Sequence, residues 1–142
     1  MLGVTMSCPP NWVDRSMLVM SAPAADRSGV APNMVVTKDT ASPTLPPAGR
    51  DRLEALLDEQ VARMRDGLVN LREEARRIDE QARSADVLVH WTSGQAAITQ
   101  WVSFIDRGGG ALTVVTATAG RDAWKDHEPT FRRMRESLTF TA

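Results

Sequence analysis

The segment ADVLVHWTSGQAAITQWVSFIDRGGGALTVVTATA, residues 85–119, decides the fold class of this chain. It contains three runs of strand length, at residues 85–92, 96–106 and 111–119. These runs are rich in the β-branched and aromatic side chains that favour strands. Ser93-Gly94-Gln95 separates the first two runs, and three consecutive glycines separate the last two. Because connections this short join antiparallel neighbours, the segment predicts an antiparallel meander.

The residues before the meander predict further strands and a helix. Short apolar runs bounded by proline, polar residues or glycine predict strands at residues 3–8, 16–21 and 33–38. Leucine, valine and methionine recur at helical spacing over residues 53–68, and Gly67 marks the expected end of that helix. The polar run LREEARRI at residues 71–78, taken alone, favours a continuation of the same helix.

A second helix is expected near the end of the chain, at residues 126–137. Pro129 is expected in its first turn, where a missing N–H costs little. The order of elements predicts an α+β fold, with an antiparallel β-sheet and two α-helices packed on one face. A length of 142 residues fits a single domain covering residues 1–142.

Charge and cysteine content exclude several classes of function. The net charge is −1, which gives no electrostatic footprint for nucleic acid or for an anionic membrane surface. No apolar run approaches the roughly 20 residues of a membrane span, so we expect no stable membrane insertion. Cys8 is the single cysteine, and the first ten residues lack the pattern of a signal peptide, so we expect a cytoplasmic protein.

No group of residues points to catalysis, a cofactor or a metal. His90 is expected to be a structural residue within a strand, and His127 a turn or capping residue at a helix start. Neither has a partner at the spacing that zinc ligands require, and no flanking motif supports a nucleophile pair with Cys8. We therefore expect no enzyme, no cofactor and no metal site.

The strands alternate poorly between apolar and polar residues. In the run at residues 96–106, one parity holds Ile98, Val102 and Phe104, and the other holds Trp101 and Ile105. If both helices cover one face, the second face is too apolar to be left in water. A large exposed apolar patch marks a protein interface, although burial by long loops is the alternative.

The order of these pieces resembles the DcrB-related family, which shares the fold of the photosystem PsbP proteins. The resemblance covers residues 2–140. It rests on PPNWVDRS at residues 9–16, on Ala22-Pro23, on the strand NMVVT and on the helix at residues 52–68. It continues with FIDR at residues 104–107 and closes with His127-Glu128-Pro129 opening the last helix.

Cytoplasmic members of similar length in this family resemble the Eag chaperones of type VI secretion. The resemblance implies a small homodimeric chaperone that shields the hydrophobic N-terminal segment of a secreted effector protein. It implies a partner-binding groove, to which we add Gln100 because it shares a strand face with two of its members. The predicted groove comprises Met17, Val19, Gln60, Leu68, Ile98, Gln100 and Val102.

Two other hypotheses remain open from the sequence. The apolar face could serve only as the homodimer interface of a structural domain, and an enzyme or small-ligand binder is the third reading. If the groove is an open surface, Val102→Asp should leave the domain folded, whereas Leu57→Asp should unfold it. If Val102 is instead core, the groove would lie on the opposite sheet face, with Ala97, Thr99 and Trp101.

Overall fold

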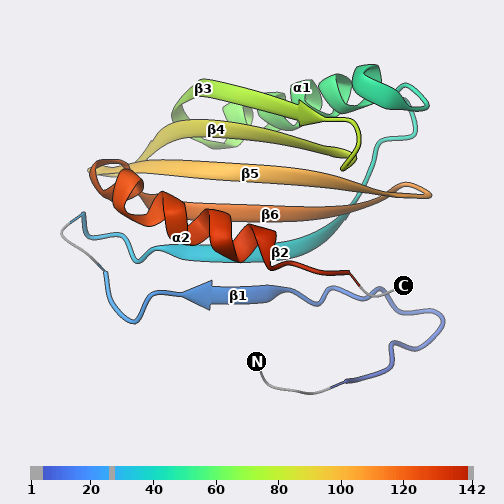
Figure 1. Ribbon diagram of the computed structural model, residues 1–142, viewed down its shortest axis with the longest axis horizontal. Coiled ribbons are helices and arrows are strands. Elements are labelled where there is room, and N and C mark those ends of the chain that lie inside the picture. The colour runs from blue at the N-terminus through green and yellow to red at the C-terminus, as the bar shows by residue number, and fades with distance from the viewer. Residues whose placement is uncertain (1–4, 26–27, 141–142) are drawn as a thin grey trace.

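The computed structural model describes residues 5–25 and 28–140, and its centre is one six-stranded antiparallel sheet. The sheet order is β1-β2-β6-β5-β4-β3, so β1 and β3 form its two edges (Figure 1). The strands are β1 (Leu18–Ser21), β2 (Asn33–Thr40), β3 (Val69–Asp79), β4 (Ser84–Ser93), β5 (Ala96–Gly108) and β6 (Ala111–Gly120). The helices are α1 (Gly49–Gly67), the short 3₁₀ turn η1 (Arg121–Ala123) and α2 (Trp124–Glu136).

The meander expected from residues 85–119 is confirmed as β4, β5 and β6. Each strand pairs antiparallel with the next in continuous register over most of its length. Gly94, Gly109 and Gly110 in the two turns all have positive φ, the backbone region that glycine adopts without steric cost. The strand β2 then pairs with β6, which joins the N-terminal part of the chain to the meander.

The two helices cover opposite faces of the sheet, so the expectation that they share one face is wrong. One core contains Leu56 and Leu57 of α1 with Val87 and Phe104 of the sheet. The other contains Phe131 of α2 with Val115 and other residues of opposite strand parity. The reason lies in the strands themselves, because both parities of β5 are apolar and each needs its own cover. Figure 1 shows α2 in front of the sheet and α1 behind it.

Residues 69–79 form the edge strand β3, so the expected continuation of the helix is wrong. The cap residue Leu68 has extended backbone angles, and Asn70 has a φ of 56°, neither of which continues a helix. The strand then pairs with β4, with register shifts on either side of Arg72-Glu73. Local helix propensity is overridden because one edge of β4 would otherwise be left without a hydrogen-bonding partner.

Two smaller expectations near the ends of the chain are also corrected. Of the strand expected at residues 3–8, the first two residues lie outside the described part and residues 5–8 are not in a strand. Pro9 and Pro10 follow directly, and neither can donate a backbone hydrogen bond to a neighbouring strand. The last helix begins at Trp124, so Pro129 lies beyond its first turn.

Candidate binding surface

Each helix covers only part of its face, which leaves one half of the sheet open on the α1 side. The helix α1 packs against β3 and β4, whereas α2 packs against β6 on the other side. On the face that carries α1, Leu112 of β6 still belongs to the core beneath the helix, whereas β1, β2 and the part of β6 at Thr116 and Thr118 lie outside that core. We call this region the α1-side surface and define it by Val19, Val35, Gln100, Thr116 and Thr118.

One row of side chains across the sheet shows how burial changes along this face. The strand register places Val19, Val35 and Thr116 side by side, followed by Val102 and Val87. Val19 is 52% exposed, Val35 and Thr116 are half-buried, and Val102 and Val87 are 4% and 1% exposed. The same row thus passes from core beneath α1 to an accessible surface at the sheet edge.

A second row is fixed by side-chain hydrogen bonds across three strands. Trp91 Nε1 donates to Gln100 Oε1 at 2.9 Å, and Gln100 Nε2 donates to Thr118 Oγ1 at 3.0 Å. These contacts hold the Gln100 amide in place with both of its ends engaged inside the protein. Gln100 therefore contributes a fixed, partly satisfied polar group to the surface.

The structure brings the seven predicted groove residues to one side of the sheet but exposes few of them. Met17 and Val19 are 62% and 52% exposed, and Leu68 is half-buried. Ile98 and Val102 are buried, at 7% and 4% exposure. Val102 belongs to the core beneath α1, so the expectation that it would tolerate a charge is wrong. The alternative groove on the opposite face is not open, because Thr99 is 0% exposed and Trp101 packs against the core that contains α2. The accessible surface lies beside Val102, on the same sheet face.

Gln60 is buried within α1, and its amide makes no hydrogen bond to any residue in the described ranges. It lies in the part of the helix that covers the core, next to Val61. The Gln60 amide can form a hydrogen bond with a bound partner only if that partner reaches the side of α1.

None of the five residues that define the α1-side surface is charged. Further along β5, the buried Asp106 accepts a hydrogen bond from Arg52 Nε at 2.7 Å and another from the Gly108 N–H at 3.0 Å. Burial by itself would raise the pKa of Asp106, but the Arg52 and Gly108 hydrogen bonds and the Arg52 and Arg83 charges hold it below the ordinary value. The ion pair therefore ties the end of β5 to the start of α1 and lies outside the uncharged area.

The histidine within β4 has a structural environment. His90 Nδ1 lies 2.7 Å from Thr99 Oγ1, and His90 Nε2 lies 3.0 Å from Glu74 Oε1. Glu74 is skipped in the register between β3 and β4, so the irregularity of the edge strand directs its carboxylate towards the ring. Thr99 has no exposed surface, so a substrate cannot reach its hydroxyl. Among residues 5–25 and 28–140, no group of three acidic, histidine or cysteine side chains could hold a metal ion.

Sequence reasoning missed Val35, Thr116 and Thr118 as surface residues. Their strands could be predicted, but the face of each residue depends on the pairing of β2 with β6 and of β6 with β5. Because a one-residue change of register moves every side chain to the other face, composition alone could not assign them.

Comparison with known proteins places this geometry in context. The DcrB family model matches residues 4–137. The structure is similar to that of PA94, a Pseudomonas aeruginosa protein of unknown function, with a TM-score of 0.81 and 17% identity over 100% of this chain and 94% of that one. It is also similar to the solution structure of the cyanobacterial PsbP protein CyanoP from Synechocystis sp. PCC 6803. That similarity has a TM-score of 0.54 and 11% identity over 96% of this chain and 98% of that one. No curated protein matches the sequence significantly.

These comparisons confirm the predicted PsbP-like fold and the predicted resemblance to the DcrB-related family. At identities of 17% and 11%, the two similar structures show only that the fold is shared. They do not assign a functional residue to this chain. In the described residues, no helix combines the length and apolar character needed to cross a membrane.

Proposed function

The chain belongs to the DcrB family, and from that premise we propose that it is a protein-binding module whose working area is the α1-side surface. The observation that carries the proposal is the uncharged, partly exposed strip from Val19 through Val35 to Thr116, which adjoins the core beneath α1 at Val102. An uncharged surface of valine and threonine suits a partner segment that also lacks charge, because no charged group has to be desolvated without a partner.

In finer detail, we propose that the partner is the hydrophobic N-terminal segment of a secreted effector. The module would then act as a cytoplasmic, homodimeric chaperone or adaptor of type VI secretion, without catalysis, cofactor, nucleic acid or stable membrane insertion. Support comes from the resemblance to the Eag chaperones together with the open sheet face. Threonine hydroxyls and the Gln100 amide on that face can hydrogen-bond polar groups that a hydrophobic segment leaves unpaired.

A second candidate is a structural homodimeric domain without chaperone activity. It is favoured by the exposed apolar side chains of β1, because a dimer interface alone would account for them. The two candidates differ in one measurable respect, since only the chaperone captures a hydrophobic segment of another protein.

The test is co-expression with the N-terminal segment of an effector encoded beside this chain, followed by co-purification. Thr116→Arg places a charge at the centre of the α1-side surface and should reduce recovery of the segment at least tenfold. Thr113→Arg is the matched control, because Thr113 is also half-buried but lies on the opposite face of the same strand.

Melting curves of both variants should stay close to that of the parent chain, which separates loss of binding from loss of fold. If Thr116→Arg unfolds the domain, Thr118→Arg, on the same face of β6, replaces it. If Thr116→Arg and Thr113→Arg recover equal amounts of the effector segment, the proposed surface is contradicted. No recovery of any hydrophobic segment by the folded parent chain would favour the structural alternative.

A further inference from the structure

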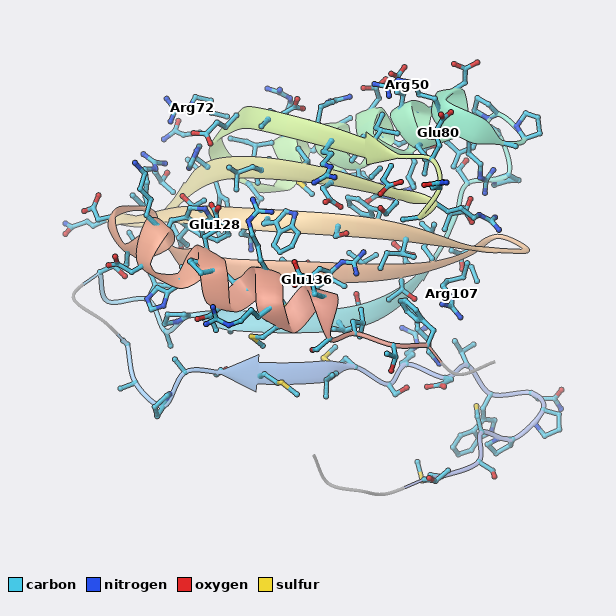
Figure 2. All side chains as sticks on the ribbon, in the orientation of Figure 1. Arg50, Arg72, Glu80, Arg107, Glu128 and Glu136 are labelled. Carbon is cyan, nitrogen blue, oxygen red and sulfur yellow. The ribbon has the colours of Figure 1, made fainter. Side chains whose placement is uncertain are left out.

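The two edges of the sheet differ in how they are protected from pairing with another strand. The edge strand β3 carries charged side chains on both faces and two register shifts, which are features that discourage edge pairing. Figure 2 shows Arg72 on β3, at the edge opposite β1. The strand β1 has no register shift, and residues 16–25 contain no charged residue.

Apolar side chains are exposed on both faces of β1. Leu18 and Met20 point to the α2 side and are 37% and 42% exposed, whereas Val19 points to the α1 side and is 52% exposed. Immediately before the strand, Met17 is 62% exposed. An uncharged edge with apolar side chains above and below it is a template for another strand.

The backbone of β1 shows which groups are free at that edge. Beyond the end of the strand, the Ala22 N–H donates to the Pro32 carbonyl at 2.8 Å. Ala22 is therefore at a hydrogen-bonded position of the pairing with β2. Such positions alternate along antiparallel strands, so Met20 and Leu18, two and four residues earlier, also direct their backbone groups towards β2. Val19 and Ser21 therefore direct their N–H and carbonyl groups outward, away from the sheet.

We propose that β1 pairs antiparallel with β1 of a second copy of this chain, about a two-fold axis at Val19. In this register Val19 faces Val19 of the second copy and exchanges both backbone hydrogen bonds with it. Leu18 faces Met20 on the α2 side, and Met17 faces Ser21. Every outward backbone group from Met17 to Ser21 then has a partner, and each apolar side chain meets another side chain without charge.

Charge and buried area both fit a second copy of this chain. The nearest charged residue to the axis is Arg15, which in this register faces Pro23 of the second copy, so the two-fold axis brings no like charges together. A stable interface needs about 800 Å² from each partner, more than a five-residue strand supplies. Trp12 and Val13, 75% and 74% exposed just before β1, provide further apolar area.

This pairing specifies the edge of the homodimer and rests on that part of the proposed function. A two-fold axis perpendicular to the sheet keeps the same face upward in both copies. The α1-side surfaces of the two copies would thus lie on one side of a continuous sheet.

The test compares Val19→Pro with Val19→Thr. Proline removes the outward N–H of residue 19 and places its ring at the pairing edge, while the bonds from β1 to β2 remain. Threonine keeps the N–H and the β-branched shape. Light scattering at micromolar concentration should give twice the monomer mass for the parent chain and for Val19→Thr, and the monomer mass for Val19→Pro, with similar melting curves.

Cross-linking fixes the register even if the proline variant does not fold. In a Cys8→Ser background, Val19→Cys should oxidise to a disulfide-linked dimer in high yield. Leu18→Cys should not, because its symmetry mate would lie about 8 Å away between Cα atoms, beyond disulfide reach.

The outcomes separate this pairing from the proposed binding function. A folded Val19→Pro that remains a dimer, or equal cross-linking at both positions, would overturn the β1 pairing. A monomeric parent chain would overturn the pairing and the homodimer together, while segment capture, measured by co-purification, would still decide the chaperone proposal.

Discussion

Asp106 ties the N-terminal part of α1 to the β5–β6 hairpin. Its side chain is 4% exposed and accepts hydrogen bonds from Arg52 of α1 and from the backbone of Gly108. Arg83 lies 3.6 Å away on the strand connection before β4 and adds a second positive charge. The ionised form of one carboxylate thus stabilises contacts among three separate segments.

We predict that Asp106→Asn lowers the free energy of unfolding by about 2 kcal/mol at neutral pH, because it removes charge-assisted hydrogen bonds. The pKa of Asp106 is lower in the folded state than its ordinary value of about 3.9. Its stabilising contribution is therefore full above about pH 4 and is lost as the pH falls towards the folded pKa.

The measurement is the melting temperature of the parent chain and the variant between pH 2 and 7. The two curves should differ at neutral pH and converge in acid. Asp66→Asn, at an exposed site near the end of α1, is the control and should change little. If the difference in melting temperature between Asp106→Asn and the parent chain is the same at every pH, the stabilisation does not depend on ionisation of Asp106.

The junction between β6 and α2 depends on a close approach of two segments. Gly120 ends β6, and the side chain of Ser28, in the connection between β1 and β2, occupies the space where a Cβ would lie. The φ of Gly120 is −62°, an angle that any residue adopts, so space and not backbone conformation requires the glycine here.

We predict that Gly120→Ala destabilises the domain by about 1–3 kcal/mol, because one methyl group must displace packed atoms. Urea unfolding of Gly120→Ala, Ser28→Gly and the double variant forms a double-mutant cycle. The double variant should recover most of the loss. Independent, additive effects of the two substitutions would show that the contact is not the cause.

At the level of elements, the sequence was sufficient where the signal was local. The meander and α1 could be predicted because glycine turns and helical spacing are encoded within short windows. The strand β3 could not, because its charged residues make no apolar alternation and its pairing with β4 decides its conformation. The strand residues of the predicted groove share one sheet face, but the position of α1 above that face decides which of them are accessible, and this position could not be read from the sequence.

At the level of the whole molecule, the two helices lie on opposite faces and over different strands. This offset explains why both faces of the sheet centre can be apolar while Val19, Val35 and Thr116 on the α1 side stay partly exposed. Both strand parities of β5 are apolar in the sequence itself, but nothing local in the sequence indicates that the second helix crosses to the other side of the sheet. That crossing follows from η1, which turns the chain immediately after β6.

The offset also predicts how the two ends of the chain contribute to stability. A chain ending at Gly120 loses α2, whose Trp124 and Phe131 are only 7% and 3% exposed and cover Val115. Removing large aromatic side chains from a core costs about 3–5 kcal/mol each, and two such losses equal the total stability of many domains. We therefore predict that residues 1–120 do not fold into a soluble domain.

Deletion of residues 1–13 should have the opposite result. Met6, Trp12 and Val13 in that segment are at least 74% exposed, and the ion pair between Asp14 and Lys38 is retained. The shortened chain should keep the parent circular dichroism spectrum and melt cooperatively, whereas residues 1–120 should show no cooperative melting. Loss of Trp12 and Val13 from the proposed β1 interface should lower the melting temperature only to the extent that the homodimer dissociates, so the difference should depend on protein concentration. A loss of the circular dichroism spectrum at any concentration would show instead that these exposed residues are needed for the fold of the single chain.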